Sequence, residues 1–173
     1  MAISAPELLN ADHDIAGFDC GKPSLNAWLQ NHALTNQVKG FTVVIVVHDD
    51  GRAVGFYGLA PTAVEPLLAP RNVRTGRSPN LLPCLLLGQL GIDLSYQGQG
   101  LGTALAAHAL ARAVMGARLT GGRALLVNAV DDEAQAAWRR RGFLPSSSDP
   151  YRLFRSMQDI EASLRAAREG TGP

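Results

Sequence analysis

The sequence predicts a mixed α/β fold in which helices cover a central sheet. A β-hairpin pattern dominates the first half of the chain, and strand-like and helix-like segments alternate in the second half. With 173 residues, no internal repeat and no long linker, the chain fits one domain of ordinary size. We therefore expect a single domain over residues 1–173, with a core over about residues 10–165 and a frayed tail at residues 169–173.

The first half contains the signals of one helix and one hairpin. Pro23 opens a segment whose apolar residues recur at helical spacing, which predicts a helix there. The β-branched run at residues 41–47 and the apolar segment at residues 53–59 predict two strands. Because the turn signal Asp50-Gly51 lies between them, the two strands should form a hairpin.

The second half should begin with an irregular stretch, because residues 61–83 contain five prolines and leave room for one short helix. Helix signals are clearest after Asp131, where acidic residues come first and arginines come last before Gly142. The pattern predicts strands at 84–93, 124–129 and 151–154, and helices at 100–118, 131–141 and 157–168.

Composition excludes several classes of protein. Cys20 and Cys84 are too far apart in sequence to suggest a disulfide framework or a zinc knuckle, so we expect buried thiols in a reducing cytoplasm. The four histidines are scattered and predict no metal site. We find no signal peptide and no apolar stretch of about 20 residues, so no membrane association is expected. The net charge is only +1, and almost all of the positive charge is arginine.

The stretch Gln97-Gly98-Gln99-Gly100-Leu101-Gly102 joins a predicted strand to a predicted helix. In such a turn, backbone N–H groups and the positive end of the helix dipole form an anion site that suits a pyrophosphate. A plain tight turn is the alternative. A dinucleotide fold is disfavoured, because the GxGxxG spacing is absent and the elements come in the wrong order.

This stretch resembles the Q/R-x-x-G-x-G/A signature of GNAT acetyltransferases, which hold the pyrophosphate of coenzyme A with it. Other blocks resemble TacT-like GNAT toxins of bacterial toxin–antitoxin pairs, in the same order along the chain. These blocks are Phe18–Gly21, Leu25–Leu29, Gly55–Leu59, Leu86–Asp93 and Trp138–Phe143.

The resemblance implies a GNAT fold, with a mixed, mostly antiparallel sheet whose middle strands splay apart, and it implies acetyl-coenzyme A as cofactor. The backbone at Leu90, Gly91 and Ile92 would pair with the pantetheine arm, and Ile92 would donate its N–H to the thioester oxygen. Asn128 ends a predicted strand, where its amide would bond the pantetheine or cap the strand. The other residues implied to bind the cofactor are Gln97, Gly98, Gln99, Gly100, Leu101, Gly102 and Thr103.

The resemblance also implies an acceptor, the α-amine of an aminoacyl-tRNA, whose acetylation blocks translation. A ribbon–helix–helix antitoxin and a homodimer are the implied protein partners. An α-amine titrates near 7.7–8.0, so it needs no strong base, and the sequence offers no evident glutamate base on the central strands. The alternatives are a GNAT enzyme for protein N-termini or small amines, and a pseudoenzyme that binds coenzyme A and a protein partner.

The chain departs from this pattern at two positions. Trp138 stands where TacT-like toxins carry the tyrosine taken as general acid, and an indole N–H donates a hydrogen bond but not its proton. Trp138 thus either donates a hydrogen bond to the departing thiolate or packs as an aromatic residue of the core. Gln89 replaces a typical arginine. The candidate acids that remain are Tyr57, Tyr96 and Tyr151, and the candidate arginines for tRNA phosphates are Arg71, Arg74, Arg77, Arg139 and Arg140.

Overall fold

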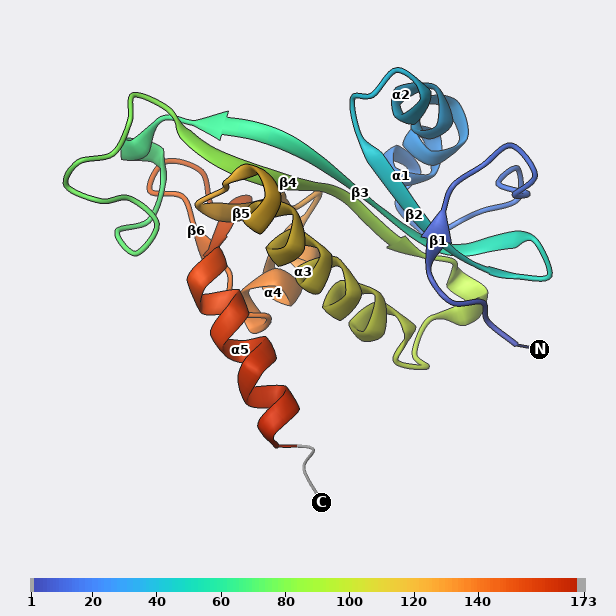
Figure 1. The fold of residues 1–173 in the computed structure, drawn as a ribbon. Helices are drawn as coiled ribbons and strands as arrows, with labels where there is room; N and C mark the ends of the chain where they lie inside the picture. The colour runs from blue at the N-terminus through green and yellow to red at the C-terminus, as the bar shows by residue number, and fades with distance from the viewer. Residues whose placement is uncertain (1, 171–173) are drawn as a thin grey trace. The chain divides into compact units, whose positions relative to one another are not determined.

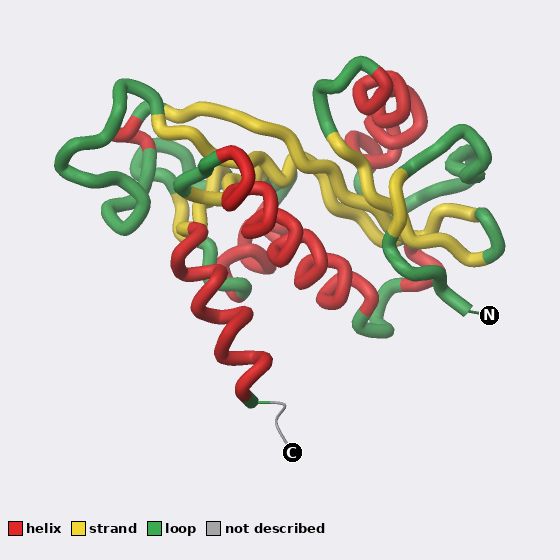
Figure 2. The backbone as a smooth tube through the Cα atoms, viewed as in Figure 1, coloured by secondary structure: helices red, strands yellow, loops and turns green. Residues whose placement is uncertain are grey.

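The computed structural model describes residues 2–170 (Figures 1 and 2). The chain divides into two compact units. Unit 1 consists of Met1–Ala60 and Gly88–Ala109, and unit 2 consists of Pro61–Leu87 and Leu110–Pro173. Two strands, β3 and β4, each begin in one unit and end in the other. The single domain expected over residues 1–173 remains a prediction.

One mixed sheet contains all seven strands, in the order β1-β2-β3-β4-β5-β7-β6. β4 and β5 run parallel, whereas β2 pairs antiparallel with β1 and β3, and β7 pairs antiparallel with β5 and β6. The predicted mixed, mostly antiparallel sheet is therefore confirmed. The strands are β1 Glu7–Leu8, β2 Val43–Asp49, β3 Arg52–Val64, β4 Leu82–Ile92, β5 Ala124–Asn128, β6 Leu144–Pro145 and β7 Arg152–Ser156.

In unit 1 a continuous helical run packs against the β2–β3 hairpin. The run consists of α1 (Pro23–Trp28), the π-helical turn η1 (Leu29–Ala33) and α2 (Leu34–Val38). Phe56 packs edge-on against Phe18 at 5.3 Å between ring centroids, and Trp28 stacks on it at 6.0 Å. The buried residues of this core are Leu9, Phe18, Cys20, Leu25, Leu29, Ala33, Val44, Val46 and Phe56.

In unit 2 the strands carry a second core, and each of its two later helices is capped. The carboxylate of Asp131 accepts the Ala134 N–H at the start of α4 (Asp132–Arg140), and the Ser156 hydroxyl accepts the Asp159 N–H at the start of α5 (Met157–Glu169). The core residues are Val64, Ala69, Val73, Leu82, Cys84, Ala124, Leu126 and Phe154.

The helix α3 (Leu101–Thr120) and both free cysteines, which are buried, agree with the sequence prediction. β3 continues through Pro61 to Val64, beyond the predicted end at residue 59, because the fixed φ of proline is compatible with an extended strand.

The prediction of a frayed tail over residues 169–173 is wrong for its first two residues. Glu169 is the last residue of α5, and Gly170 caps that helix. The rest of that tail, residues 171–173, lies outside the described residues. No helix of the described residues is long and apolar enough to cross a bilayer.

We expect Leu126→Ala to lower the free energy of unfolding by about 2–5 kcal/mol, because it leaves a cavity in the core of unit 2. Leu126 is 1% exposed, whereas Leu119, the matched control on α3, is 85% exposed. Leu119→Ala should therefore change the stability by less than about 0.5 kcal/mol. Urea unfolding of the two variants measures both values, and equal losses would contradict the core assignment.

Candidate active site

In unit 1, β4 ends at Ile92 and the chain passes through a short turn into α3. The turn begins with the single 3₁₀ turn η3 (Leu94–Tyr96) and continues through the glycine-rich stretch. Gly98 and Gly100 have φ of 76° and 83°, and no atom lies within 4 Å of where a Cβ would stand on either. The Gly100 carbonyl accepts the Ala104 N–H, so the free N–H groups of the first helical turn belong to residues 101–103.

The side chain of Gln97 fastens this turn to the strand before it. Its Nε2 donates to the Ile92 carbonyl at 2.8 Å and to the Cys20 carbonyl at 3.1 Å. Both amide hydrogens are therefore used on backbone oxygens, and Gln97 shapes the turn with its side chain. The backbone of the turn, together with Thr103 in the first turn of α3, remains for an anion.

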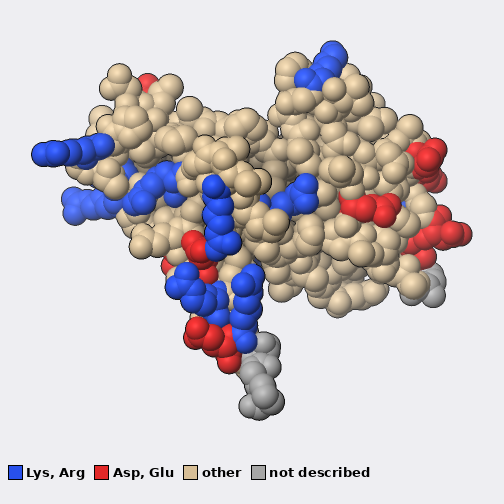
Figure 3. Space-filling view, in the orientation of Figure 1, with Lys and Arg blue, Asp and Glu red and all other residues tan. Residues whose placement is uncertain are grey.

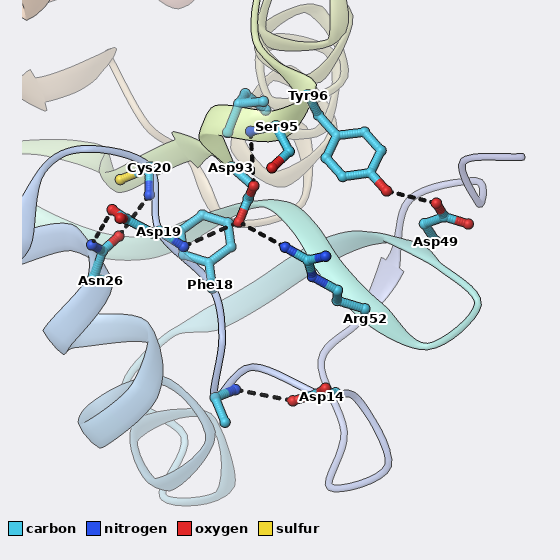
Figure 4. Close-up of polar contacts among 12 residues, drawn as sticks. Asp14, Phe18, Asp19, Cys20, Asn26, Asp49, Arg52, Asp93, Ser95 and Tyr96 are labelled. Carbon is cyan, nitrogen blue, oxygen red and sulfur yellow. Dashed lines mark hydrogen bonds and ion pairs between the residues drawn. The ribbon is translucent and has the colours of Figure 1, made fainter. Parts of the chain in front are cut away.

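The buried carboxylate of Asp93, directly after Ile92, connects three segments (Figure 4). Asp93 is 2% exposed and accepts the Asp19 N–H at 3.1 Å and the Ser95 N–H at 2.9 Å. The guanidinium of Arg52, on β3, lies 3.6 Å from the same carboxylate. A buried charge needs such partners, because leaving it unpaired would cost several kcal/mol (about 3–5).

The segment before α1 packs against the end of β4. Asp19 accepts the Gly21 N–H and the Asn26 side-chain amide, and these two hydrogen bonds lower the pKa of Asp19. A Cβ on Gly91 would lie 3.2 Å from the Cys20 Sγ. The glycine in this strand is thus explained by the close approach of a protein side chain.

In unit 2, Trp138 is packed on α4 and is 8% exposed. Its ring meets Phe143 edge-on at 5.2 Å, and the Arg141 guanidinium lies 5.1 Å from its centroid as a cation–π contact. Burial and, to a smaller degree, Arg140 lower the pKa of Arg141. Within the described residues the indole N–H has no hydrogen bond and is not fully buried.

The candidate arginines all lie in unit 2. The loop that carries Arg71, Arg74 and Arg77 is held by buried Val73, whose carbonyl accepts the Arg123 Nε–H at 2.5 Å. Arg71 and Arg77 are exposed and Arg74 is half-buried. Asn128 at the end of β5 is exposed, and among the described residues its side chain has no hydrogen bond, which leaves it available to a ligand. Arg139 and Arg140, in the last turn of α4, are also exposed.

Comparison with known proteins decides the family. Residues 40–145 match the family described as an acetyltransferase (GNAT) domain. The chain belongs to this family. It is 40% identical over 161 residues to a tRNA-acetylating toxin of Mycobacterium tuberculosis, covering 93% of this chain and 96% of that relative.

Solved structures agree with this assignment. AtaT complexed with acetyl-methionyl-tRNAfMet is 27% identical, with a TM-score of 0.84 over 94% of this chain and 99% of that one. A Tyr→Phe variant of AtaT, bound to the C-terminus of the antitoxin AtaR and to acetyl-CoA, is also 27% identical. Its TM-score is 0.78, over 94% of this chain and 98% of that one.

None of the three tyrosines of this GNAT chain is suited to act as a general acid in place of Trp138. Tyr57 is completely buried, with its hydroxyl 2.7 Å from His108 Nδ1, so it cannot touch a substrate. The hydroxyl of Tyr96 donates to Asp49 and that of Tyr151 donates to Asp132. These hydrogen bonds to carboxylates raise the pKa of both phenols, so each holds its proton more tightly than a free tyrosine does.

Charge is distributed unevenly between the two units of this GNAT chain. Residues 1–60 and 88–109 contain three Lys or Arg and seven Asp or Glu, a net charge of −4. Residues 61–87 and 110–173 contain thirteen Arg and eight Asp or Glu, a net charge of +5. In Figure 3 blue side chains extend from the loop between β3 and β4, whereas blue and red side chains are mixed over α5. The net charge of +1 of the whole chain therefore conceals a strongly basic part.

Sequence reasoning missed a cluster of Glu7, His13 and His48 in unit 1. Pairing of β1 with β2 brings Glu7 near His48, and His13 contacts Glu7 from the turn after β1. Both Nε2 atoms lie within 3.0 Å of Glu7 Oε1, while both Nδ1 atoms accept backbone N–H groups, from Asn10 and Gly51. A histidine that binds a metal through Nε2 needs a proton on Nδ1. Those backbone donors oppose such a proton, so we interpret the cluster as a hydrogen-bonded clamp on β1.

We expect Gln97→Glu to weaken acetyl-coenzyme A binding more than Gln99→Glu does. Both variants add one negative charge to the same turn, but only Gln97→Glu places a carboxylate against two carbonyl oxygens. Losing one such hydrogen bond costs about 1–3 kcal/mol, so an additional loss of tenfold or more in affinity is expected. Calorimetry measures both dissociation constants, and equal effects would show that the side chain of Gln97 does not shape the turn.

Proposed function

We propose that this chain is an acetyl-coenzyme A-dependent N-acetyltransferase that acetylates the α-amine of an aminoacyl-tRNA and so blocks translation. The strand–turn–helix at residues 90–103 carries the proposal, because its geometry fits a pyrophosphate at the signature of the GNAT family. The 40% identity to a tRNA-acetylating toxin supports the choice of acceptor.

The cofactor fits the residues that are present in unit 1. Space is open above Gly98 and Gly100, and the N–H groups of residues 101–103 point out of the first turn of α3. Bound here, acetyl-coenzyme A supplies the acetyl group as an activated thioester. The backbone of Leu90, Gly91 and Ile92 would pair with the pantetheine arm. The side chain of Gln97 contributes by holding this backbone in place.

The chain needs to supply little acid–base chemistry at the acceptor. The α-amine titrates near 7.7–8.0, so a large fraction is neutral at cell pH and its excess proton passes to water. Ile92 would donate its backbone N–H to the carbonyl oxygen while the N–C bond forms and the C–S bond breaks. Such a donor is typically worth about 2.7–4 kcal/mol of barrier.

Trp138 would stabilise the departing thiolate as a hydrogen-bond donor. Its indole N–H is not fully buried and has no hydrogen bond among the described residues, and the Arg141 cation on its ring makes the surroundings more favourable to a negative charge. A thiol with a pKa near 8.5 leaves readily as its anion, so full proton transfer is not required. The second candidate is a pseudoenzyme in which the missing acid has stopped turnover, and the fact that Trp138 cannot transfer a proton favours it.

The basic unit 2 is suited to the acceptor RNA. Its net charge of +5 and its exposed arginines supply phosphate contacts, which dominate the affinity of proteins for nucleic acids. We further propose a cytoplasmic location, a homodimer and inhibition by a ribbon–helix–helix antitoxin. AtaT, which binds the C-terminus of its antitoxin, supports the last of these proposals.

Transfer of labelled acetyl from acetyl-coenzyme A to a bulk pool of charged tRNA tests the function. We expect label on the aminoacyl group and none on uncharged tRNA, because only the charged form carries an α-amine. A triple variant, Arg71→Ala, Arg74→Ala and Arg77→Ala, should raise the KM for tRNA and lower its salt dependence while coenzyme binding stays unchanged. Label on protein N-termini or small amines alone would reject the tRNA acceptor.

We expect Trp138→Tyr to raise kcat and to introduce a decline in rate at high pH. A tyrosine at this position supplies a general acid, typically worth about 10²–10⁴ in rate, and that acid is lost once the phenol ionises. The matched controls Tyr96→Phe and Tyr151→Phe should leave kcat unchanged within about twofold, because both phenols are held on carboxylates. A pH–rate profile of the four proteins measures this, and unchanged activity of Trp138→Tyr would indicate a different mechanism.

A further inference from the structure

The segment between β3 and β4, residues 65–81, has little regular structure but is anchored in unit 2. We call it the arginine loop, because it carries Arg71, Arg74 and Arg77. Figure 2 shows it as irregular backbone apart from one short helical turn, η2 (Pro66–Leu68). Loops of this length are ordinarily mobile, yet Ala69 and Val73 are 2% and 0% exposed and belong to the core of unit 2. The loop is therefore packed against the unit that carries it.

Arg123, the residue before β5, holds the middle turn of the arginine loop. Its guanidinium donates from Nε to the Val73 carbonyl at 2.5 Å and from Nη2 to the Asn72 carbonyl at 3.2 Å. The same turn is closed by the N–H groups of Val73 and Arg74, which both donate to the Pro70 carbonyl. A planar guanidinium on two successive carbonyl oxygens fixes the orientation of the turn, and an ammonium group does not reproduce that planar pairing.

Ser146, directly after β6, holds the first turn of the arginine loop. Its hydroxyl donates to the Leu68 carbonyl at 2.7 Å, and Ser146 is only 7% exposed. The exposed neighbour Ser147 donates to the Leu67 carbonyl at 3.2 Å. Water replaces a lost hydrogen bond at an exposed site but not at a buried one, so Ser146 is the stronger anchor.

These anchors determine where the arginines of the loop lie. Arg71 is the second residue of the turn that Pro70 closes, and Arg77 lies in a turn in which the Thr75 N–H donates to the Ser78 hydroxyl at 2.9 Å. Among the described residues the side chains of Arg71, Arg74 and Arg77 make no hydrogen bond or ion pair. The loop thus presents three unpaired guanidinium groups on a backbone that other segments of unit 2 hold in place.

We propose that Arg123 and Ser146 are positioning residues for the acceptor RNA. They hold the arginine loop in the shape in which its three arginines meet RNA phosphates, and this role rests on the proposed function. A loop that is already ordered binds without the entropy cost of ordering it, so its anchors contribute to affinity without contacting the RNA. Although Arg123 is an arginine of the basic unit, its guanidinium acts on the carbonyl oxygens of the loop and not on phosphate.

Acetyl transfer to charged tRNA at varied tRNA concentration tests the role of both residues. We expect Arg123→Lys, which keeps the charge, and Ser146→Ala to raise the KM for tRNA about fivefold or more, the loss typical of a buried carbonyl without its donor. The kcat and the dissociation constant of acetyl-coenzyme A should change by less than about twofold, because neither residue touches a reacting group. Hydrogen exchange at residues 68–74 should become faster in both variants.

The matched control is Ser147→Ala, which removes an exposed hydrogen bond from the same loop and should change the KM by less than about twofold. Thermal melting shows whether each variant is folded. A double-mutant cycle then separates positioning from a general structural role. When Arg71, Arg74 and Arg77 are all replaced by alanine, adding Ser146→Ala should change the KM by less than about twofold, because the groups that it positions are gone.

Three results would overturn the positioning role. The first is an unchanged KM in both Arg123→Lys and Ser146→Ala. The second is an equal rise in KM when Ser146→Ala is added to the triple alanine variant, because Ser146 would then act on something other than the loop arginines. The third is a failure of the unaltered protein to label charged tRNA, which would reject the proposed function as well, whereas the first two results would leave that function intact.

Discussion

The buried carboxylate of Asp93 holds together the part of the molecule that we assign to the coenzyme. It receives backbone N–H groups from the segment before α1 and from the turn after β4, and the guanidinium of Arg52 from β3 lies beside it. Because charge in a buried site is tolerated only when it is paired, these three segments must be in place together. The turn at Gln97–Gly102 therefore depends on residues nearly 80 positions earlier in the chain, such as Cys20, whose carbonyl accepts from Gln97.

The need to pair the Asp93 carboxylate explains the polar residues in the sequence blocks that resemble TacT-like toxins. Asp19 and Asn26 bond each other and the backbone of Cys20 and Gly21, so the segment before α1 keeps one conformation. Gly91 then allows Cys20 to lie against β4. The side chains of these residues bond one another and the neighbouring backbone, so they hold the backbone in a fixed position. A fixed backbone is suited to align with an extended cofactor.

Sequence reasoning predicted the long elements and the glycine-rich turn before α3, because each has a local signal. The apolar runs of β2 and β4 and the capped helix α4 are examples. It missed β1 and β6, since two residues show no periodicity, and it missed the role of Asp93, whose partner Asp19 lies 74 residues away. The charge difference between the units was equally hidden, because the division falls inside β3 and β4 and no break in composition marks it.

The surroundings of Trp138 bear on how this chain departs from its relatives. Phe143 and Arg141 fix the ring by its edge and its face, and a phenol ring offers the same kind of surfaces. The packing on α4 is therefore compatible with either an indole or a phenol ring. The two rings differ in what they can do with their polar hydrogen. A phenol transfers its proton and an indole only shares it. In the proposed mechanism the residue at this position would therefore set the degree of acid assistance to the thiolate, and the adjacent Arg141 guanidinium would add positive charge beside it.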